Sequence, residues 1–147
     1  LILDIKKITA VPVAVITNAS LLNVALVRQA LSCADLIIPS LDAVTPEIFT
    51  KVDRPKEGIN VEDIINGLIG LRKEFKGKIW LEVMLVKGIN DDLAHIRKLK
   101  DIIDKINPDK IQLNSPVRTT AEDNILATDK KKLEKFKEIL GDKCEII

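Results

Sequence analysis

Polar residues able to bind a small molecule follow four apolar runs of this chain, each at the point where the run ends. Their hydroxyl, amide and carboxylate groups can both donate and accept hydrogen bonds. In a parallel α/β sheet, ligands bind at the carboxyl ends of the strands. If the four runs are neighbouring strands, these polar groups gather along one edge of the sheet. The groups are Asn18 and Ser20, Ser40 and Asp42, Lys87 to Asn90, and Asn114 with Ser115.

The apolar runs alternate with segments of helical periodicity, which is the pattern of βαβ units and a parallel sheet. The expected strands are residues 13–17, 34–39, 78–86 and 110–113, with a short last strand at 144–147. The expected helices are 20–30, 60–75, 90–106 and 128–140. Residues 43–59 and 115–127 are expected to be loops, the first with a helical turn after Pro46. The predicted helix caps are Ser20, Asn60 with Asp63, Asn90 with Asp91, and Thr128.

The composition is that of one soluble globular domain. The chain has 147 residues, 46% of them hydrophobic, and its net charge of +1 creates no overall field that would attract nucleic acid or an anionic membrane. No apolar stretch approaches the ~18 residues of a membrane span, so we expect a cytoplasmic protein without a membrane partner. Cys33 and Cys144 have no Cys or His at metal-ligand spacing and are interpreted as ordinary thiols.

Four βα units are too few for a closed eight-stranded barrel, which needs about 250 residues. The sheet is therefore either open or part of a barrel. The chain begins with Leu1 instead of Met, and its apolar positions 1, 5 and 8 fit the last turns of a helix. We interpret the sequence as a fragment of a longer protein, whose exposed strand edge favours dimers formed by strand pairing.

Five segments resemble, in their order and approximate spacing, motifs of radical S-adenosylmethionine (radical SAM) enzymes. The likeness is greatest to an iron-sulfur oxidoreductase branch related to wyosine-type tRNA-modifying and molybdenum-cofactor enzymes. It implies an α/β fold, a partial (β/α) barrel whose four parallel βα units correspond to strands three to six of a six-stranded radical SAM barrel. The segments are residues 17–20 (Thr-Asn-Ala-Ser), 38–43 (Ile-Pro-Ser-Leu-Asp-Ala), 53–55 (Asp-Arg-Pro), 81–91 (Leu-Glu-Val-Met-Leu-Val-Lys-Gly-Ile-Asn-Asp) and 112–118 (Gln-Leu-Asn-Ser-Pro-Val-Arg).

Two motifs of the family have no counterpart in this chain, namely the Cys-x3-Cys-x2-Cys loop and the Gly-Glu segment, and Ala19 replaces a family glycine. By resemblance, residues 1–147 are the C-terminal portion of the core domain without its cluster-binding part, and are inactive alone. In the family, a 4Fe-4S cluster binds S-adenosylmethionine and cleaves it to a 5′-deoxyadenosyl radical. The substrate is not implied, and tRNA is one candidate. No metal ligand and no catalytic residue is assigned.

The resemblance also implies a set of residues that bind S-adenosylmethionine. Ser40 and Asp42 would face its ribose hydroxyls and sulfonium side, because a hydroxyl donates and accepts while a carboxylate accepts from both diol protons. Strand alternation places Glu82 and Met84 on one face, which the resemblance puts inside the barrel with Met84 beside the adenine. Asparagines at two further strand ends would bracket the cofactor. The six residues are Asn18, Ser40, Asp42, Glu82, Met84 and Asn114.

The residues alone also allow other interpretations. Ser40 and Asp42 could simply cap a loop, and Glu82 could form a salt bridge in the core. Lys87, at the carboxyl end of a strand, could form a Schiff base in a (β/α) barrel lyase. The size and alternation also suit a non-catalytic, doubly wound ligand-binding or regulatory domain. His95 lies among basic residues on an expected helix and is predicted to be a solvated surface residue.

Overall fold

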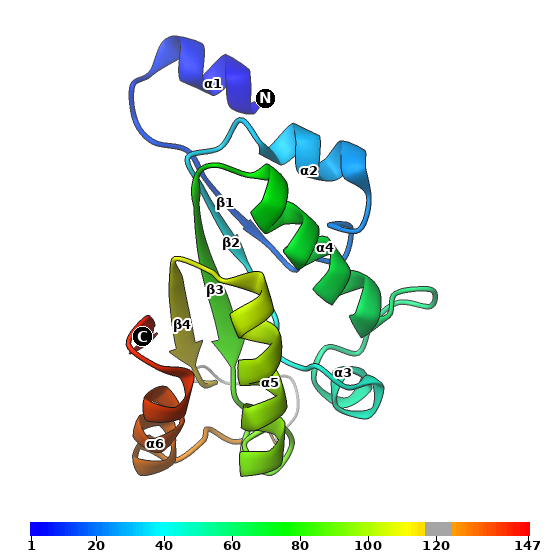
Figure 1. Cartoon of the computed structure of the whole chain (residues 1–147), viewed down its shortest axis with the longest axis vertical. Helices are drawn as coiled ribbons and strands as arrows, with labels where there is room; N and C mark the ends of the chain where they lie inside the picture. Colours follow the sequence, from blue (N-terminus) through cyan, green and yellow to red (C-terminus); the bar gives the residue numbers. More distant parts are fainter. Residues whose placement is uncertain (117–124) are drawn as a thin grey trace.

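The computed structural model describes residues 1–116 and 125–147, and this part of the chain forms one parallel sheet (Figure 1). The expected loop 115–127 and the segment 112–118 extend into residues outside the described part. The sheet has five strands in chain order: β1 Ala14–Thr17, β2 Leu36–Pro39, β3 Lys78–Met84, β4 Lys110–Asn114 and β5 Cys144–Ile146. The helices are α1 Ile2–Ile8, α2 Ala25–Leu31, α3 Pro46–Val52, α4 Val61–Glu74, α5 Leu93–Ile106 and α6 Lys130–Leu140.

The main helices α2, α4, α5 and α6 cover one face of the sheet (Figure 1), because right-handed connections between sequential parallel strands all cross the same side. Leu81, Val83 and Leu85 point to this side and are fully buried. Alternate residues lie on the opposite face and are only half-buried. The result is a partial (β/α) barrel, as predicted, and not a doubly wound sheet with helices on both faces. We call the second face the open face, defined by Ser40, Glu82, Met84, Gln112 and Asn114.

The helix ends follow the sequence patterns in some places and depart from them in others. The predicted capping box of α4 is confirmed, because the Asn60 side chain accepts a hydrogen bond from the Asp63 N–H at 2.8 Å. The helical turn after Pro46 is the helix α3. Ser20, however, does not cap α2, which begins at Ala25. The Ser20 hydroxyl instead donates to Asn18 Oδ1 at 2.8 Å, so these residues form a turn that separates β1 from the helix.

β1 is an edge strand within the described part of the chain, since it pairs only with β2. Apolar side chains near this edge are exposed, and Ile16 and Leu26 each have an exposed fraction of 73%. The predicted strand-paired dimer would use this edge and stays a prediction. Among residues 1–116 and 125–147, no helix combines the length and the apolar character that crossing a membrane requires.

A close approach between α4 and the turn after β1 depends on Gly67. A methyl group at this position would lie 2.5 Å from the Leu22 carbonyl carbon and 2.6 Å from the Asn23 nitrogen. We expect Gly67→Ala to lower the free energy of unfolding by about 2–3 kcal/mol in urea titrations, because the backbone of the turn must move. Gly70→Ala on the same helix is the matched control, since its methyl group meets first the flexible Arg28 side chain at 3.3 Å.

Alanine is favoured over glycine in a helix by about 1 kcal/mol, so the Gly70 variant is expected to be as stable as the wild type or more stable. Equal free energies of unfolding for the two variants would show that the turn after β1 moves away from α4 without loss of stability.

Candidate functional site

The structure places the six predicted site residues at the carboxyl ends of β1 to β4. In the sheet register Ser40 lies opposite Glu82, and Met84 lies opposite Asn114. Asn18 directly follows β1 and Asp42 follows β2 by three residues. Ser40, Glu82, Met84 and Asn114 lie on the open face, and all are partly exposed. The edge is therefore shared by residues from four of the five strands, β1 to β4, and their role in cofactor binding stays a prediction.

Glu82 and Asn114 form the central polar pair of the open face. The Asn114 side-chain amide donates to Glu82 Oε1 at 2.7 Å, so the carboxylate is not in a salt bridge within the described residues. The second polar atom of Asn114, Oδ1, is buried and has no hydrogen-bond partner among those residues. Most buried polar atoms in proteins are paired. This oxygen is an unsatisfied acceptor at the carboxyl edge, and a ligand donor reaches it once the side chains that cover it move aside.

Asp42 joins the two central strands at the same edge. Its Oδ1 accepts the Met84 N–H at 2.7 Å, while the neighbouring Leu41 N–H donates to the Glu82 carbonyl oxygen at 2.9 Å. The carboxylate therefore takes the place that a backbone carbonyl would fill in the ladder. Burial raises the pKa of Asp42 to about 7, opposed by the Met84 hydrogen bond and reinforced by the negative charges of Asp53 and Glu82.

Two buried side chains hold the backbone of Asp42 from behind. Asn90 has 0% exposure, and its Nδ2 donates to the carbonyl oxygens of Asp42 at 2.8 Å and Met84 at 2.9 Å. His95 Nε2 lies 3.3 Å from the same Asp42 oxygen. The prediction of a solvated His95 is wrong, since this residue is 2% exposed and burial lowers its pKa. Its spacing of four residues from the buried Leu99 was the sequence pattern that could have indicated this.

A second network joins the ends of β3 and β4 to α6. The Ser115 hydroxyl donates to the Leu85 carbonyl at 2.6 Å and accepts the Thr128 N–H at 2.8 Å. Asp91 Oδ2 accepts from Lys132 Nζ at 2.9 Å. Asn90, Asp91 and Thr128 are therefore wrong as predicted helix caps, because their side chains bond between elements. The N-cap residues of the two helices are Asp92 for α5 and Asp129 for α6.

Lys87 takes no part in these two buried hydrogen-bond networks. Its side chain is 46% exposed and its Nζ forms an ion pair with Asp129 at 3.4 Å. A Schiff-base lysine needs burial to lower its pKa, or another cation beside it. The exposed position and the acidic neighbour therefore argue against a lyase that uses Lys87.

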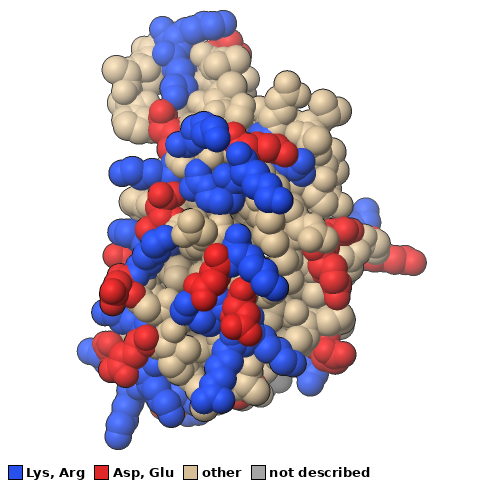
Figure 2. Space-filling view, viewed as in Figure 1, with Lys and Arg blue, Asp and Glu red and all other residues tan. Residues whose placement is uncertain are grey.

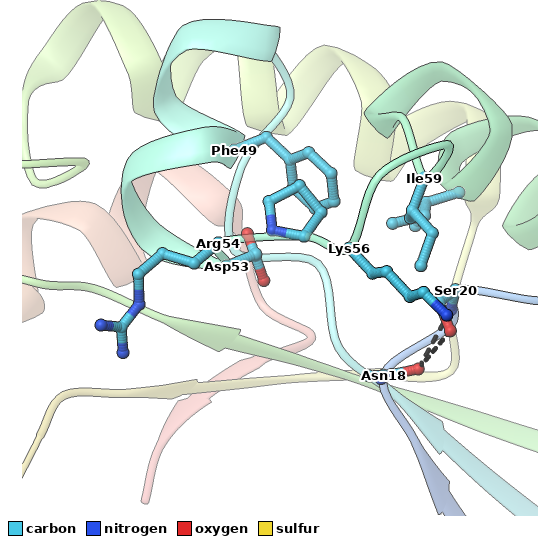
Figure 3. A pocket seen from close by; sticks show the side chains of 9 residues that line it. Asn18, Ser20, Phe49, Asp53, Arg54, Lys56 and Ile59 are labelled. Atoms are coloured by element: carbon cyan, nitrogen blue, oxygen red, sulfur yellow. Dashed lines mark hydrogen bonds between the residues drawn. The ribbon is translucent and has the colours of Figure 1, made fainter.

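A pocket of about 270 Å³ opens between the turn after β1 and the loop from α3 to α4 (Figure 3). Phe49 and Ile59 form apolar walls, and Lys56 extends towards Asn18 and Ser20 (Figure 3). The pocket therefore combines an apolar wall with polar groups at the carboxyl end of β1, as small-molecule sites do.

One charged residue and one residue with a strained backbone border this pocket. Asp53 is an exposed residue as a whole, yet its carboxyl group points into the pocket (Figure 3), and burial raises its pKa to about 6. Ala19, which lies between Asn18 and Ser20 of the pocket lining, adopts a left-handed φ of +62°. A residue other than glycine loses about 1–2 kcal/mol in this conformation, so the turn at the end of β1 is strained.

Comparison of the fold with solved structures leads to radical SAM enzymes. A domain of pyruvate-formate lyase-activating enzyme from Bacteroides vulgatus superposes with a TM-score of 0.71 at 16% identity, over 90% of this chain and 79% of that chain. A radical SAM methyltransferase from Sphaerobacter thermophilus gives a TM-score of 0.72 at 17% identity, over 91% and 39% of the two chains. This chain has the radical SAM fold. The predicted resemblance is confirmed at this level.

A third solved structure of similar fold contains S-adenosylmethionine. SuiB from Streptococcus suis, solved with S-adenosylmethionine bound, gives a TM-score of 0.64 at 15% identity, over 86% of this chain and 28% of that chain.

Sequence relatives are longer than this chain. The relative named GTPase Obg from Brachyspira hyodysenteriae is 42% identical over 146 residues, which are 99% of this chain and 22% of the relative. A UPF0026 protein from Synechocystis sp. is 38% identical over 114 residues, which are 78% of this chain and 42% of the relative. A probable dual-specificity RNA methyltransferase RlmN from Thermotoga sp. is 32% identical over 82 residues, which are 55% of this chain and 23% of the relative. The chain thus spans less than half of each of these relatives, and no family model matches it.

The raised pKa of Asp42 gives a testable dependence of stability on pH. Its value in the fold is about 7, compared with 3.8 for an ordinary aspartate. Because the folded state retains the proton up to higher pH, stability is lost as pH rises from about 4 to 7, and the loss is complete above 7. Asp42→Asn keeps an oxygen for the Met84 N–H but cannot ionise. We expect it to be more stable than the wild type at pH 8, by up to about 4 kcal/mol.

Urea unfolding of both proteins between about pH 4 and pH 8 measures this difference. Asp101→Asn, an exposed residue of α5, serves as the control for the same chemical change. A stability difference between Asp42→Asn and the wild type that stays constant across the range would contradict the assigned ionisation.

Proposed function

We propose that this chain forms part of the S-adenosylmethionine-binding and substrate-binding surface of a radical SAM enzyme. One observation carries the proposal: the buried, unpartnered Oδ1 of Asn114 lies beside Glu82 at the carboxyl edge of a sheet with the radical SAM fold. A ligand that donates to Asn114 and carries positive charge towards the carboxylates would satisfy both features. S-adenosylmethionine has hydroxyl and amino donors and a sulfonium cation, so its chemistry fits the groups present.

Each of the six residues has a role in this proposal that its position supports. Asn114 Oδ1 would accept from a hydroxyl or amino group of the cofactor, and Glu82 would hold the Asn114 amide in orientation through its 2.7 Å hydrogen bond. Met84 would provide an apolar contact for the adenine from the open face. Ser40 and Asp42 would bind the ribose hydroxyls, and Asn18 would close the site at the end of β1.

The cluster ligands of the enzyme would have to come from outside this chain. A 4Fe-4S cluster in this family is held by three cysteine thiolates, and the chain has two cysteines in total. Cys144 is buried in the core at the start of β5, and Cys33 follows α2. Within the described residues no group of His, Cys, Asp and Glu could hold a metal ion. When bound together, the cluster and S-adenosylmethionine supply a 5′-deoxyadenosyl radical.

The reaction of the enzyme is a finer part of the proposal. We infer a parent enzyme of the oxidoreductase or transferase type, which the methyltransferase among the structural neighbours supports. The RNA methyltransferase among the relatives is compatible with an RNA substrate such as tRNA. On the helical face drawn in Figure 2, basic and acidic side chains are mixed over α4 to α6, without a continuous basic surface. An RNA substrate would therefore approach by another face.

Binding of S-adenosylmethionine to the chain tests the proposed site. We expect Asn114→Ala to weaken the affinity about tenfold, because it removes the free acceptor and leaves Glu82 without its amide partner. Isothermal titration with S-adenosylmethionine measures the change. Asn66→Ala, on the exposed side of α4, is the matched control and should bind like the wild type. The absence of saturable binding by the wild type would refute the proposed function.

Anaerobic reconstitution with iron and sulfide tests the assignment of the cluster ligands. Because two cysteines cannot supply three thiolates, we expect no stoichiometric 4Fe-4S chromophore in the visible spectrum of the chain. One intact cluster per chain, by iron analysis and absorbance, would show that the ligands assumed to lie elsewhere are provided here.

A further inference from the structure

We propose that His95 is a positioning residue that holds the Asp42 carboxylate in place for the cofactor, acting through the Asp42 backbone carbonyl. This inference rests on the proposed function, in which Asp42 binds the ribose. His95 itself contacts neither the open face nor the pocket of Figure 3, because it lies in the first turn of α5 and is buried. Its effect must therefore pass through its neighbours.

The contacts of Asp42 show how that effect would pass. The Asp42 carbonyl oxygen is shared by His95 Nε2 at 3.3 Å and Asn90 Nδ2 at 2.8 Å. The carboxylate at the other end of the same residue accepts the Met84 N–H at 2.7 Å. Two donors on the carbonyl and one on the carboxylate thus restrict both ends of Asp42. Without either carbonyl donor the Asp42 backbone is less restricted, and so is the carboxylate that rotates about its side-chain bonds.

The geometry determines which nitrogen of His95 carries the proton. A carbonyl oxygen can only accept, so Nε2 must be the donor, and Nδ1 of the neutral ring is then an acceptor. Nδ1 is buried and has no partner among the described residues. A buried acceptor without a donor costs stability, and an apolar side chain at this position would avoid that cost. Packing alone therefore gives no reason for histidine here.

The charges around the pair favour a neutral donor. The Asp42 carboxylate lies near the negative charges of Asp53 and Glu82, while Asp92 and Lys98 act with opposite signs on the His95 ring. Burial lowers the pKa of His95, so the ring stays neutral near pH 7 and donates without adding a charge. His95 can thus position the carboxylate without adding a positive charge, which would weaken the attraction between a sulfonium ligand and the nearby carboxylates.

Three measurements on His95→Leu and His95→Gln separate this role from simple packing. The leucine variant removes the donor but keeps an apolar side chain in the core. The glutamine variant keeps a donor at a similar distance from the backbone. The measurements are the hydrogen-exchange rate of the Met84 amide, the affinity for S-adenosylmethionine and the midpoint of urea unfolding. Arg97→Leu, on the exposed side of the same helix, is the control.

For His95→Leu we expect the Met84 amide to exchange about tenfold faster and the affinity to fall about tenfold, with the urea midpoint within about 0.3 M of the wild type. His95→Gln should restore both values. Unchanged Met84 exchange in His95→Leu would overturn the positioning role, and so would faster Met84 exchange in both variants together with a fall of more than about 0.3 M in both urea midpoints. If the wild type does not bind S-adenosylmethionine, the proposed function fails, while the Met84 exchange rate still decides whether His95 positions Asp42.

Discussion

The parallel order of the strands is the constraint on which the rest of this structure depends. Each strand from β1 to β4 pairs in parallel with the next one in the sequence, so each connecting helix must return over the same face of the sheet. Residues of one parity, such as Leu81 and Val83, are then buried beneath helices. Residues of the other parity, such as Glu82 and Met84, face away from these helices. A carboxylate in the middle of a parallel strand is tolerated for this reason, since it lies on the side that no helix of the described part covers.

Much of this arrangement could be predicted because it depends on local patterns. The alternation of apolar runs with helical stripes determines the order of strands and helices, and parity along β3 determines the face of Glu82. Asn60 was recognised as a cap because its partner Asp63 is three residues away, within the same turn. The short strand β5 and the helix after Pro46 were predicted from equally local patterns. In each case, the residues that decide the structure lie within a few positions of one another.

Apart from Ser20, which bonds Asn18 within its own turn, the residues that the sequence misassigned act over long distances in the chain. Asn90 precedes a helix and has the side chain of a cap, yet its amide bonds the Asp42 carbonyl, 48 positions away. Thr128 has the same local appearance, but its hydroxyl donates to the Leu85 carbonyl, 43 positions away. His95 has charged neighbours in the sequence that point to the other side of α5, while its own ring is buried. No local pattern distinguishes a polar side chain that caps its own helix from one that reaches another element.

Asp42 shows how such a long-range bond couples the fold to its candidate function. One carboxylate oxygen already accepts the Met84 N–H, so the side chain completes the sheet before it can serve a ligand. The same burial that makes this bond strong penalises the charge, as the raised pKa of Asp42 indicates. A cationic ligand on the open face would offset that penalty, because it would favour the ionised form. Ligand binding and the pairing of β2 with β3 would then stabilise one another, since a ligand that binds only the folded form adds to its stability.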